Sequence, residues 1–389
     1  MSGYSVELAR PAALAGLLAT TVLLGACATE EQPRPAERMV NLGFEDVAAE
    51  DPAHLKQLGG RLDQVQATAV SIAVGRTDWT AFPWEAHPES ASAEVKRTGR
   101  DFVAESIAAL QQPGPLQQSG PLHQSGSLDQ SGTAQKRDVI LTIDVLLDKA
   151  ITADPSLAGR NPVGKASGSF ASLSSLRTGV AGTRLAELAA AVAKRYRPTA
   201  VNLTELMFDE YTFGPDDLQD FTSAMHRSDW PRRADGTIDT AAAEVTAWRT
   251  HAMADIVRKV RSAVEPFGVD LDMDVRSPSV SASADRADSG QNYDLLLEQL
   301  DRIHVWEYVG LNNERSPGTE ELVKALRQRA GTRYSLSIGL WSGDGSISPD
   351  ELERTLRLAA DGGAASVSVT PASLMGDGHW DALRRAWAR

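Results

Sequence analysis

Residues 183–206 read TRLAELAAAVAKRYRPTAVNLTEL, and this stretch decides the fold class. In its first part, 183–196, apolar residues recur at the spacing of an amphipathic helix. Its second part, 199–206, is a short run of mainly apolar and β-branched residues, which is typical of a strand. Helix and strand therefore follow one another within 24 residues, as they do in α/β proteins.

The same alternation runs through most of the chain. Eight runs have strand character: 39–44, 68–75, 138–145, 199–206, 269–275, 303–310, 334–341 and 365–371. Helical periodicity follows or separates most of them, at 102–110, 183–196, 241–264, 293–300, 319–330, 349–360 and 380–388. Eight alternating units predict a single-domain (β/α)8 TIM barrel over residues 39–389. An open doubly wound sheet is the alternative, but the first run leads into GFEDVAAED, which has no glycine-rich phosphate motif.

Composition excludes several classes of function. The 389 residues include 39 Lys and Arg, 52 Asp and Glu and one cysteine, and the net charge is −13. This acidic balance argues against a nucleic-acid partner, because capture of phosphates depends on clustered Lys and Arg. One cysteine cannot form an intramolecular disulfide, and the seven scattered histidines include no HExxH pattern. We therefore expect neither a metal site nor a cofactor.

The N-terminus resembles a bacterial lipoprotein signal. Residues 11–26, PAALAGLLATTVLLGA, are apolar but too short to span a bilayer, and they end directly before Cys27. The resemblance implies that residues 1–26 are removed and that Cys27 is lipidated, so that residues 27–38 form a tether. We expect an extracytoplasmic monomer anchored to the bacterial membrane; an ordinary secretory signal is the alternative.

An insert interrupts the alternation at residues 111–136. It contains the near-repeats PLQQSG, PLHQSG and SLDQSG, which are too polar to offset the entropy lost on ordering. It precedes a predicted strand, so in a barrel it belongs to the face opposite the active site. We predict a flexible, catalytically irrelevant loop.

Acidic and aromatic residues gather where the predicted strands end, which is where TIM barrels carry their active sites. Glycoside cleavage needs two carboxylates, one to protonate the leaving oxygen and one to act as nucleophile or to activate water. The candidate catalytic residues are Glu205, Asp274 and Glu307. The candidate substrate-binding residues are Arg76, Asp78, Trp79, Trp84, Asp209, Glu210, Tyr211, Arg276, Trp306, Tyr308 and Trp341.

Each catalytic candidate has a structural alternative. Glu205 could be a buried acid paired with Arg76 or Arg276. Period 2 puts Asp272, Asp274 and Arg276 on one face of their strand, so an internal Asp–Arg network is equally consistent. Period 2 also leaves open whether Glu307, between Trp306 and Tyr308, faces the lumen or the outside. Asp144 is predicted to be a hydrogen-bonding residue of the lumen.

Two stretches resemble known glycosidases. YRPTAVNLTELMFDEYTFGPDD (196–217) and the later helix beginning Trp248-Arg249 are similar to family-10-like TIM-barrel glycosidases of bacterial envelopes. The match departs where that family often has an Asp pair, because Thr204-Glu205 stands there and Asp209-Glu210 follows four residues later. FGVDLDMD (267–274) resembles the DxxDxDxE signature of chitinase-type barrels, with Asp274 in place of the glutamate.

The resemblance implies a lipid-anchored glycoside hydrolase acting on a polysaccharide or oligosaccharide. A barrel without catalytic activity that binds a glycan or a partner protein at the cell surface is the alternative, because one fold supports many functions. The end of the seventh run, LWSGD, supports this alternative, since it lacks the glutamate that many retaining barrel glycosidases carry there.

Overall fold

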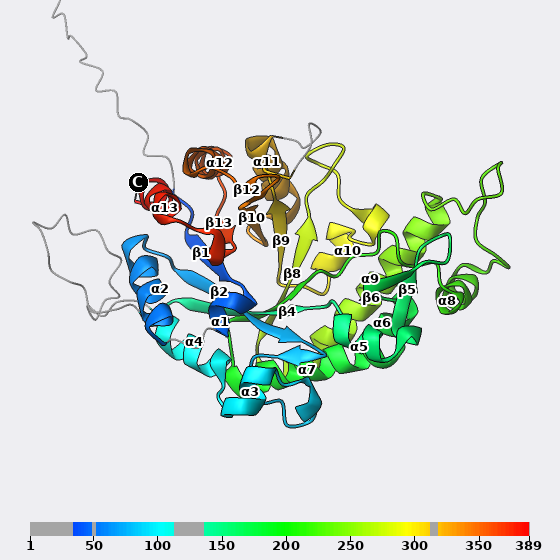
Figure 1. Ribbon diagram of the computed structural model, residues 1–389. Helices are drawn as coiled ribbons and strands as arrows, with labels where there is room; N and C mark the ends of the chain where they lie inside the picture. Colours follow the sequence, from blue (N-terminus) through cyan, green and yellow to red (C-terminus); the bar gives the residue numbers. More distant parts are fainter. Residues whose placement is uncertain (1–33, 49–51, 113–135, 312–317, 389) are drawn as a thin grey trace, which may run out of the picture. The chain divides into compact units, whose positions relative to one another are not determined.

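The eight predicted strands form a closed parallel barrel (Figure 1). The computed structural model describes residues 34–48, 52–112, 136–311 and 318–388. The barrel strands are β1 (Glu37–Leu42), β2 (Ala69–Arg76), β4 (Asp138–Asp144), β7 (Ala200–Thr204), β8 (Asp270–Arg276), β9 (Arg302–Glu307), β10 (Tyr334–Gly339) and β13 (Ser366–Thr370). The first strand, β1, pairs with both β2 and β13, and this closes the sheet. The predicted TIM barrel is confirmed.

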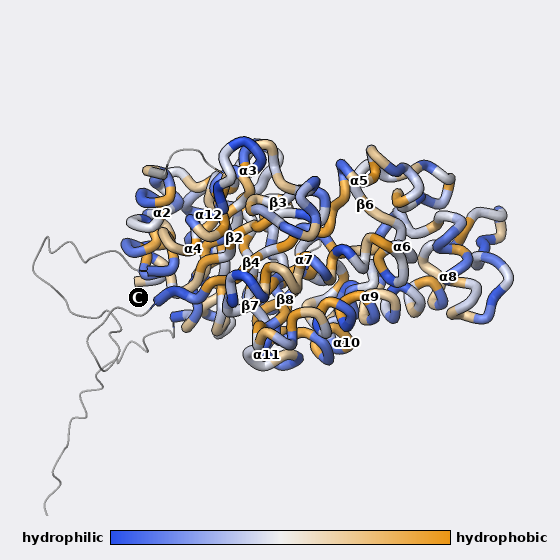
Figure 2. Tube along the Cα trace, turned by 90° about the horizontal axis from the view of Figure 1, so that it is seen from below, coloured by the Kyte–Doolittle hydropathy of each residue, from blue (hydrophilic) through white to orange (hydrophobic). Residues whose placement is uncertain are grey.

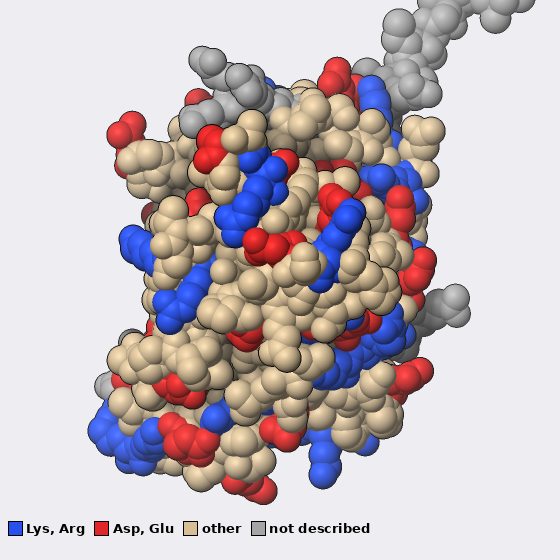
Figure 3. All heavy atoms as spheres, turned by 90° about the vertical axis from the view of Figure 1, so that its right-hand side faces the viewer, with Lys and Arg blue, Asp and Glu red and all other residues tan. Residues whose placement is uncertain are grey.

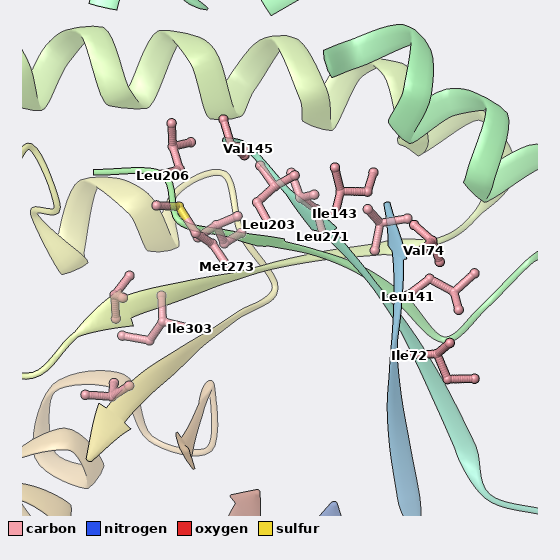
Figure 4. Packing of buried hydrophobic residues seen from close by; sticks show 14 of the residues in the cluster. Ile72, Val74, Leu141, Ile143, Val145, Leu203, Leu206, Leu271, Met273 and Ile303 are labelled. Atoms are coloured by element: carbon pink, nitrogen blue, oxygen red, sulfur yellow. The ribbon is translucent and has the colours of Figure 1, made fainter. Parts of the chain in front are cut away.

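Alternation along each strand explains why the barrel is stable. Every second side chain points outward, and these positions are almost all Val, Ile, Leu or Met. Figure 4 labels several of them, such as Ile143, Leu203 and Met273, on the side of the strands that the helices cover. Burial of this layer is the main favourable term in folding, at roughly 25 cal/mol per Å² of apolar surface.

The helices cover the outside of the barrel. The longer ones are α2 (Pro52–Gln64), α4 (Phe102–Leu110), α7 (Val180–Tyr196), α9 (Ala243–Val264), α11 (Thr319–Ala330), α12 (Pro349–Asp361) and α13 (Asp377–Trp387), with the short α10 (Tyr293–Leu297) after β8. Hydrophobic and hydrophilic residues alternate along them, as expected of helices with one buried face (Figure 2). Among these, α2 was not predicted; Gly59 and Gly60 in its middle weaken its helical signal.

Short extra elements extend the C-terminal ends of the strands. They are α1 (Phe44–Val47), β3 (Trp79–Thr80), α3 (Ala93–Thr98), α5 (Asp148–Ala153), β5 (Ala158–Arg160), β6 (Ala166–Ala171), α6 (Leu173–Arg177), α8 (Pro215–Met225), β11 (Trp341–Ser342) and β12 (Gly345–Ser346). The elements after β4 and β7, namely α5, β5, β6, α6 and α8, lie together at the right of Figure 1. We call the end of the barrel formed by the last residues of its strands the barrel mouth.

The boundaries of the barrel differ slightly from those predicted. Residues Gln32–Arg389 form one compact unit, and β1 begins at Glu37, two residues inside the predicted tether. Residues 1–26, Cys27 and most of the insert (113–135) lie outside the described residues. The elements that flank the insert, α4 and β4, have their nearest ends at the end of the barrel opposite the mouth. In the described part of the chain, no helix combines the length and hydrophobicity needed to cross a membrane.

Candidate active site

The lumen of the barrel changes from apolar to polar toward the mouth. Near the first residues of the strands, Met39, Ala69, Ile140 and Ala200 form a small buried apolar cluster. Further along, hydroxyl and amide side chains hydrogen-bond across neighbouring strands; Ser71 and Thr142 approach to 2.8 Å between their oxygens. Beyond this polar layer the strands end in the charged groups of the mouth, such as Arg76, Asp144 and Arg276, where substrate can reach them.

Asp274 lies on the lumen face of β8. It alternates with the outward-facing Met273 and Val275, as the period-2 pattern predicts. Its Oδ1 accepts a hydrogen bond of 3.0 Å from Nδ2 of Asn202 on β7. Burial raises the pKa of Asp274, and the charge of His304 and the hydrogen bond from Asn202 oppose this rise. Asp274 is therefore a carboxyl group with a fixed orientation whose ionisation depends on its neighbours.

Glu205 follows the last residue of β7 and stands at the mouth. Its backbone has φ 60°, a left-handed conformation that a non-glycine residue adopts at a cost of about 1 kcal/mol. Burial, together with the negative charges of Asp144 and Asp274, raises the pKa of Glu205 to about 7, although Arg76 and Arg276 oppose the shift. Glu205 thus holds a proton near neutral pH, which is what a general acid requires.

The two arginines of the mouth pair with carboxylates other than Glu205. Nε of Arg76 donates to Oδ2 of Asp144 at 2.8 Å, and its Nη1 lies 2.5 Å from Asp148. Arg276 pairs with Asp209. Within the described residues Glu205 has no ion-pair partner, so the predicted alternative in which Arg76 or Arg276 neutralises it is not what the structure contains.

Glu307 lies on the opposite face of its strand from Asp274 and His304. His304 and Trp306 are the register partners of Asp274 and Arg276, so they share the lumen face, and Glu307 points outward to α11. There its Oε1 accepts a 2.7 Å hydrogen bond from Thr319, and the side chain is buried. Burial raises the pKa of Glu307. The structure brings Glu205 and Asp274 together at the lumen but leaves Glu307 behind the barrel wall.

Three aromatic residues line one side of the mouth. The rings of Trp306 and Tyr308 stack with centroids 5.2 Å apart and planes 14° apart, and the centroid of Trp341 lies 5.2 Å beyond Tyr308. Gly339 makes room for Tyr308, since a Cβ at that position would lie 2.2 Å from the tyrosine ring. Trp341 keeps 36 % of its surface exposed and so offers a flat apolar face to a ligand.

A pocket of about 220 Å³ lies beside the loop that follows Glu205. Its lining includes Phe170 of β6, Phe208, Glu210 and Tyr211. The rings of Phe170 and Tyr211 stack at 6.0 Å with an interplanar angle of 9°. In an eight-stranded barrel the end of β4, which leads to β6, is opposite the end of β10, which leads to Trp341. Aromatic surfaces therefore stand on opposite sides of the two carboxyl groups.

Two solved structures have a fold similar to that of this chain. The PgaB (BpsB) glycoside hydrolase domain from Bordetella bronchiseptica matches with a TM-score of 0.65 at 15% identity, over 91% of this chain and 99% of that one. The catalytic domain of β-amylase from Paenibacillus polymyxa matches with a TM-score of 0.60 at 11% identity, over 90% and 97%. This chain has the fold of the TIM-barrel glycoside hydrolases. No protein-family model and no curated protein sequence matches it.

The remaining predicted binding residues have mainly structural contacts. Asp78 accepts hydrogen bonds of 2.9 Å from the backbone N–H groups of Lys149 and Ala150 and so holds the first turn of α5. Trp79 packs edge-on against Phe44 at 4.8 Å. Trp84 is buried against His87, away from solvent. These three contacts shape the β2 loop rather than offer a free surface.

Three site residues were not predicted from the sequence. Asn202 positions Asp274, Phe170 completes the pocket with Tyr211, and His304 forms a buried hydrogen bond with Asp272. Period 2 along the fourth run could have placed Asn202 on the lumen face with Thr204. Phe170 had no such signal, because it comes from a short hairpin far from Tyr211 in sequence.

Charged residues mix on the side of the molecule to which β4 and β7 lead. Figure 3 shows Lys and Arg beside Asp and Glu on this face, without a broad patch of one sign. Among the described residues, no group of three His, Cys, Asp or Glu side chains is arranged to hold a metal ion. The chemistry that these residues offer is proton transfer between carboxyl groups beside apolar rings.

Proposed function

We propose that the protein is a glycoside hydrolase that acts on a polysaccharide or oligosaccharide, with Glu205 as general acid and Asp274 as the second carboxylate. The observation that carries this proposal is the pKa of about 7 of Glu205, a residue at the barrel mouth with Asp144 and Asp274 as neighbours. A protonated carboxylic acid can protonate the leaving glycosidic oxygen, while a carboxylate beside it acts as nucleophile or activates water.

The aromatic residues supply a binding surface for sugars. Trp341 and Tyr308 on one side and Tyr211 with Phe170 on the other present ring faces that can stack on the C–H surface of a pyranose. Around the barrel, β7 and β8 lie between β4 and β9. Arg276 at the end of β8 and Asp209 in the loop after β7 therefore stand between the two aromatic surfaces, and both can form hydrogen bonds with sugar hydroxyl groups. Glu307 has no part in this site, because it faces α11.

The test is hydrolysis of a panel of polysaccharides by the wild-type chain and two variants. Glu205→Gln and Asp274→Asn should each abolish release of reducing ends from every glycan that the wild type cleaves, whereas the control variant Glu298→Gln, at an exposed position between α10 and β9 at the end of the barrel opposite the mouth, should not. Retention or inversion of the anomeric configuration, followed by NMR, then reports whether Asp274 attacks the sugar directly or through water. If glycans bind but none is cleaved, the barrel is a glycan-binding protein without catalytic activity.

We also propose that the chain is an extracytoplasmic lipoprotein anchored through Cys27, with the barrel as a monomer on a short tether. The apolar run that ends directly before the only cysteine supports this. Metabolic labelling with radioactive palmitate should mark the wild type and not Cys27→Ser. Equal labelling of both proteins, or a labelled product that retains residues 1–26, would argue against the anchor.

A further inference from the structure

A buried acid–base pair lies in the lumen beside Asp274. Nε2 of His304 on β9 is 3.1 Å from Oδ2 of Asp272 on β8. Both side chains are almost wholly inaccessible, with exposed fractions of 3% and 5%. The proposed acid chemistry uses neither residue. Burying a histidine and its carboxylate partner costs desolvation energy, and charges in such a dry environment act strongly on the ionisable groups around them.

The barrel geometry sets His304 between two carboxyl groups. Asp272 and Asp274 are two residues apart on β8 and therefore share its lumen face. His304 is the register partner of Asp274, while its hydrogen bond is made to Asp272. The imidazole is thus held by one carboxylate and lies next to the other.

The other charged groups near His304 form an ion pair of their own. Arg302, two residues earlier on β9, pairs with Glu37 of β1, and Glu37 also accepts a hydrogen bond from Ser366 of β13. On the other side, the register partner of His304 on β10 is the uncharged Ser335. The charge of Arg302 opposes protonation of His304, and Asp272 and Asp274 are the groups that favour it.

Burial alone would lower the pKa of His304, but the hydrogen bond and charge of Asp272, together with the charge of Asp274, raise it above its ordinary value. The pair with Asp272 thus favours the protonated imidazole. A positive charge beside Asp274 lowers the pKa of that carboxyl group and so opposes the effect of burial.

We propose that His304 is a positioning residue of the proposed active site: anchored by Asp272, its imidazolium keeps Asp274 in the carboxylate form beside protonated Glu205. This inference rests on the proposed function for its catalytic consequence. The effect of His304 on the ionisation of Asp274 follows from the positions of Asp272, Asp274 and His304 and does not depend on the proposed function.

The first experiment measures ionisation directly and needs no substrate. NMR of the full chain with labelled histidine should show that His304 stays doubly protonated to a higher pH than an ordinary histidine, whose pKa is about 6.5. Asp272→Asn should bring its titration below the ordinary value of about 6.5. The carboxyl carbon of Asp274 should titrate about one pH unit higher in His304→Gln than in the wild type. A neutral His304 at pH 7 in the wild type, or an unchanged Asp274 titration, overturns the proposal.

The second experiment uses the pH dependence of kcat/KM on a polysaccharide that the wild type cleaves. In His304→Gln the acidic limb should move up by about one pH unit, which is a roughly tenfold loss on that limb, with activity recovering at higher pH. The matched control is His379→Gln, which removes another buried histidine, on α13, whose Nε2 bonds to a backbone oxygen. A uniform loss at every pH would show a merely structural role.

The double variant Asp272→Asn/His304→Gln tests whether His304 acts on Asp274 only when Asp272 holds it protonated. Without Asp272 the imidazole is no longer held protonated, so adding His304→Gln to Asp272→Asn should shift the acidic limb less than His304→Gln does in the wild type. Additive shifts would contradict the proposal. If the wild type cleaves no glycan, the proposed function fails, while the NMR titrations still decide whether His304 controls Asp274. Asp272→Asn, which preserves shape, covers the case in which His304→Gln does not fold.

Discussion

Arg76 forms its ion pair with Asp144, 2.8 Å from Nε to Oδ2, and not with Glu205. The last residues of β2 and β4 are neighbours in the barrel, and a second acid, Asp148, receives another N–H group of the same guanidinium. The positive charge nearest to Glu205 is therefore shared with two other acids. Burial and the negative charges of Asp144 and Asp274 raise the pKa of Glu205 to about 7, and Arg76, paired with two other acids, offsets only part of this rise.

Replacing Glu205 by Gln should lower kcat by 10²- to 10⁴-fold, because the amide cannot protonate a leaving oxygen. Glycan affinity should stay within a few-fold, since the side chain keeps its size. Stopped assays and isothermal titration with the cleaved polysaccharide measure the two effects. Glu298→Gln, at an exposed position after α10 at the end of the barrel opposite the mouth, should retain activity; a similar loss in both variants would move the general acid away from Glu205.

Activity should fall as the pH rises through about 7, since the general acid must be protonated and the pKa of Glu205 is about 7. The basic limb of the pH dependence of kcat/KM reports the pKa of the general acid in the free enzyme. In the variant Asp144→Asn one of the charges that raise this pKa is removed, so the limb should move to lower pH. A basic limb that stays in place in this variant would assign it to another group.

Glu205→Gln should stabilise the protein at alkaline pH. The folded state binds the Glu205 proton up to about pH 7 and the unfolded state releases it near 4.5, so wild-type stability is lost as the pH rises through this window. The glutamine variant has no such loss. Urea denaturation should find the variant more stable by about 2 kcal/mol at pH 8 after allowance for partial solvation, and the difference should vanish near pH 4. A difference independent of pH would refute this linkage.

Arg76→Met should destabilise the fold by about 3 kcal/mol, because it leaves Asp144 buried without its cationic partner. Arg227→Met is the matched control: Arg227 pairs with Glu244 on the surface, where both side chains are well exposed, and its loss should cost less than about 1 kcal/mol. Denaturant midpoints at pH 7 compare the two. Equal costs would mean that the Arg76 pair adds no more than a surface pair.

Trp341→Ala should weaken glycan binding about tenfold while leaving Tm almost unchanged, since the indole is exposed and stacks at its edge on Tyr308. Titration of the catalytically inactive Glu205→Gln background with oligosaccharides of increasing length measures the loss. Val180→Ala, an exposed apolar residue at the start of α7, serves as the control. Unchanged affinity in Trp341→Ala would exclude this ring from the binding surface.

The sequence predicted the barrel because its signals are local. Hydrophobic periodicity and strand composition need only neighbouring residues, and all eight predicted runs overlap barrel strands. It missed the hairpin β5–β6 and the helices α5, α6 and α8, which are short and carry too few periodic positions to stand out from loops. Local patterns also predicted that Glu205 stands at the end of its strand and that Asp274 shares one face of its strand with Asp272 and Arg276.

Tertiary structure alone decided which charges meet. Sequence left Glu205 free to pair with Arg76 or Arg276; the stagger of neighbouring strands instead gave Arg76 to Asp144 and Arg276 to Asp209. It also turned Glu307 outward and brought His304 to Asp272, because register fixes the face of every side chain in a strand at once. Periodicity thus determined the barrel and its rim of acids, whereas the ionisation of each acid depends on distances across strands far apart in the chain.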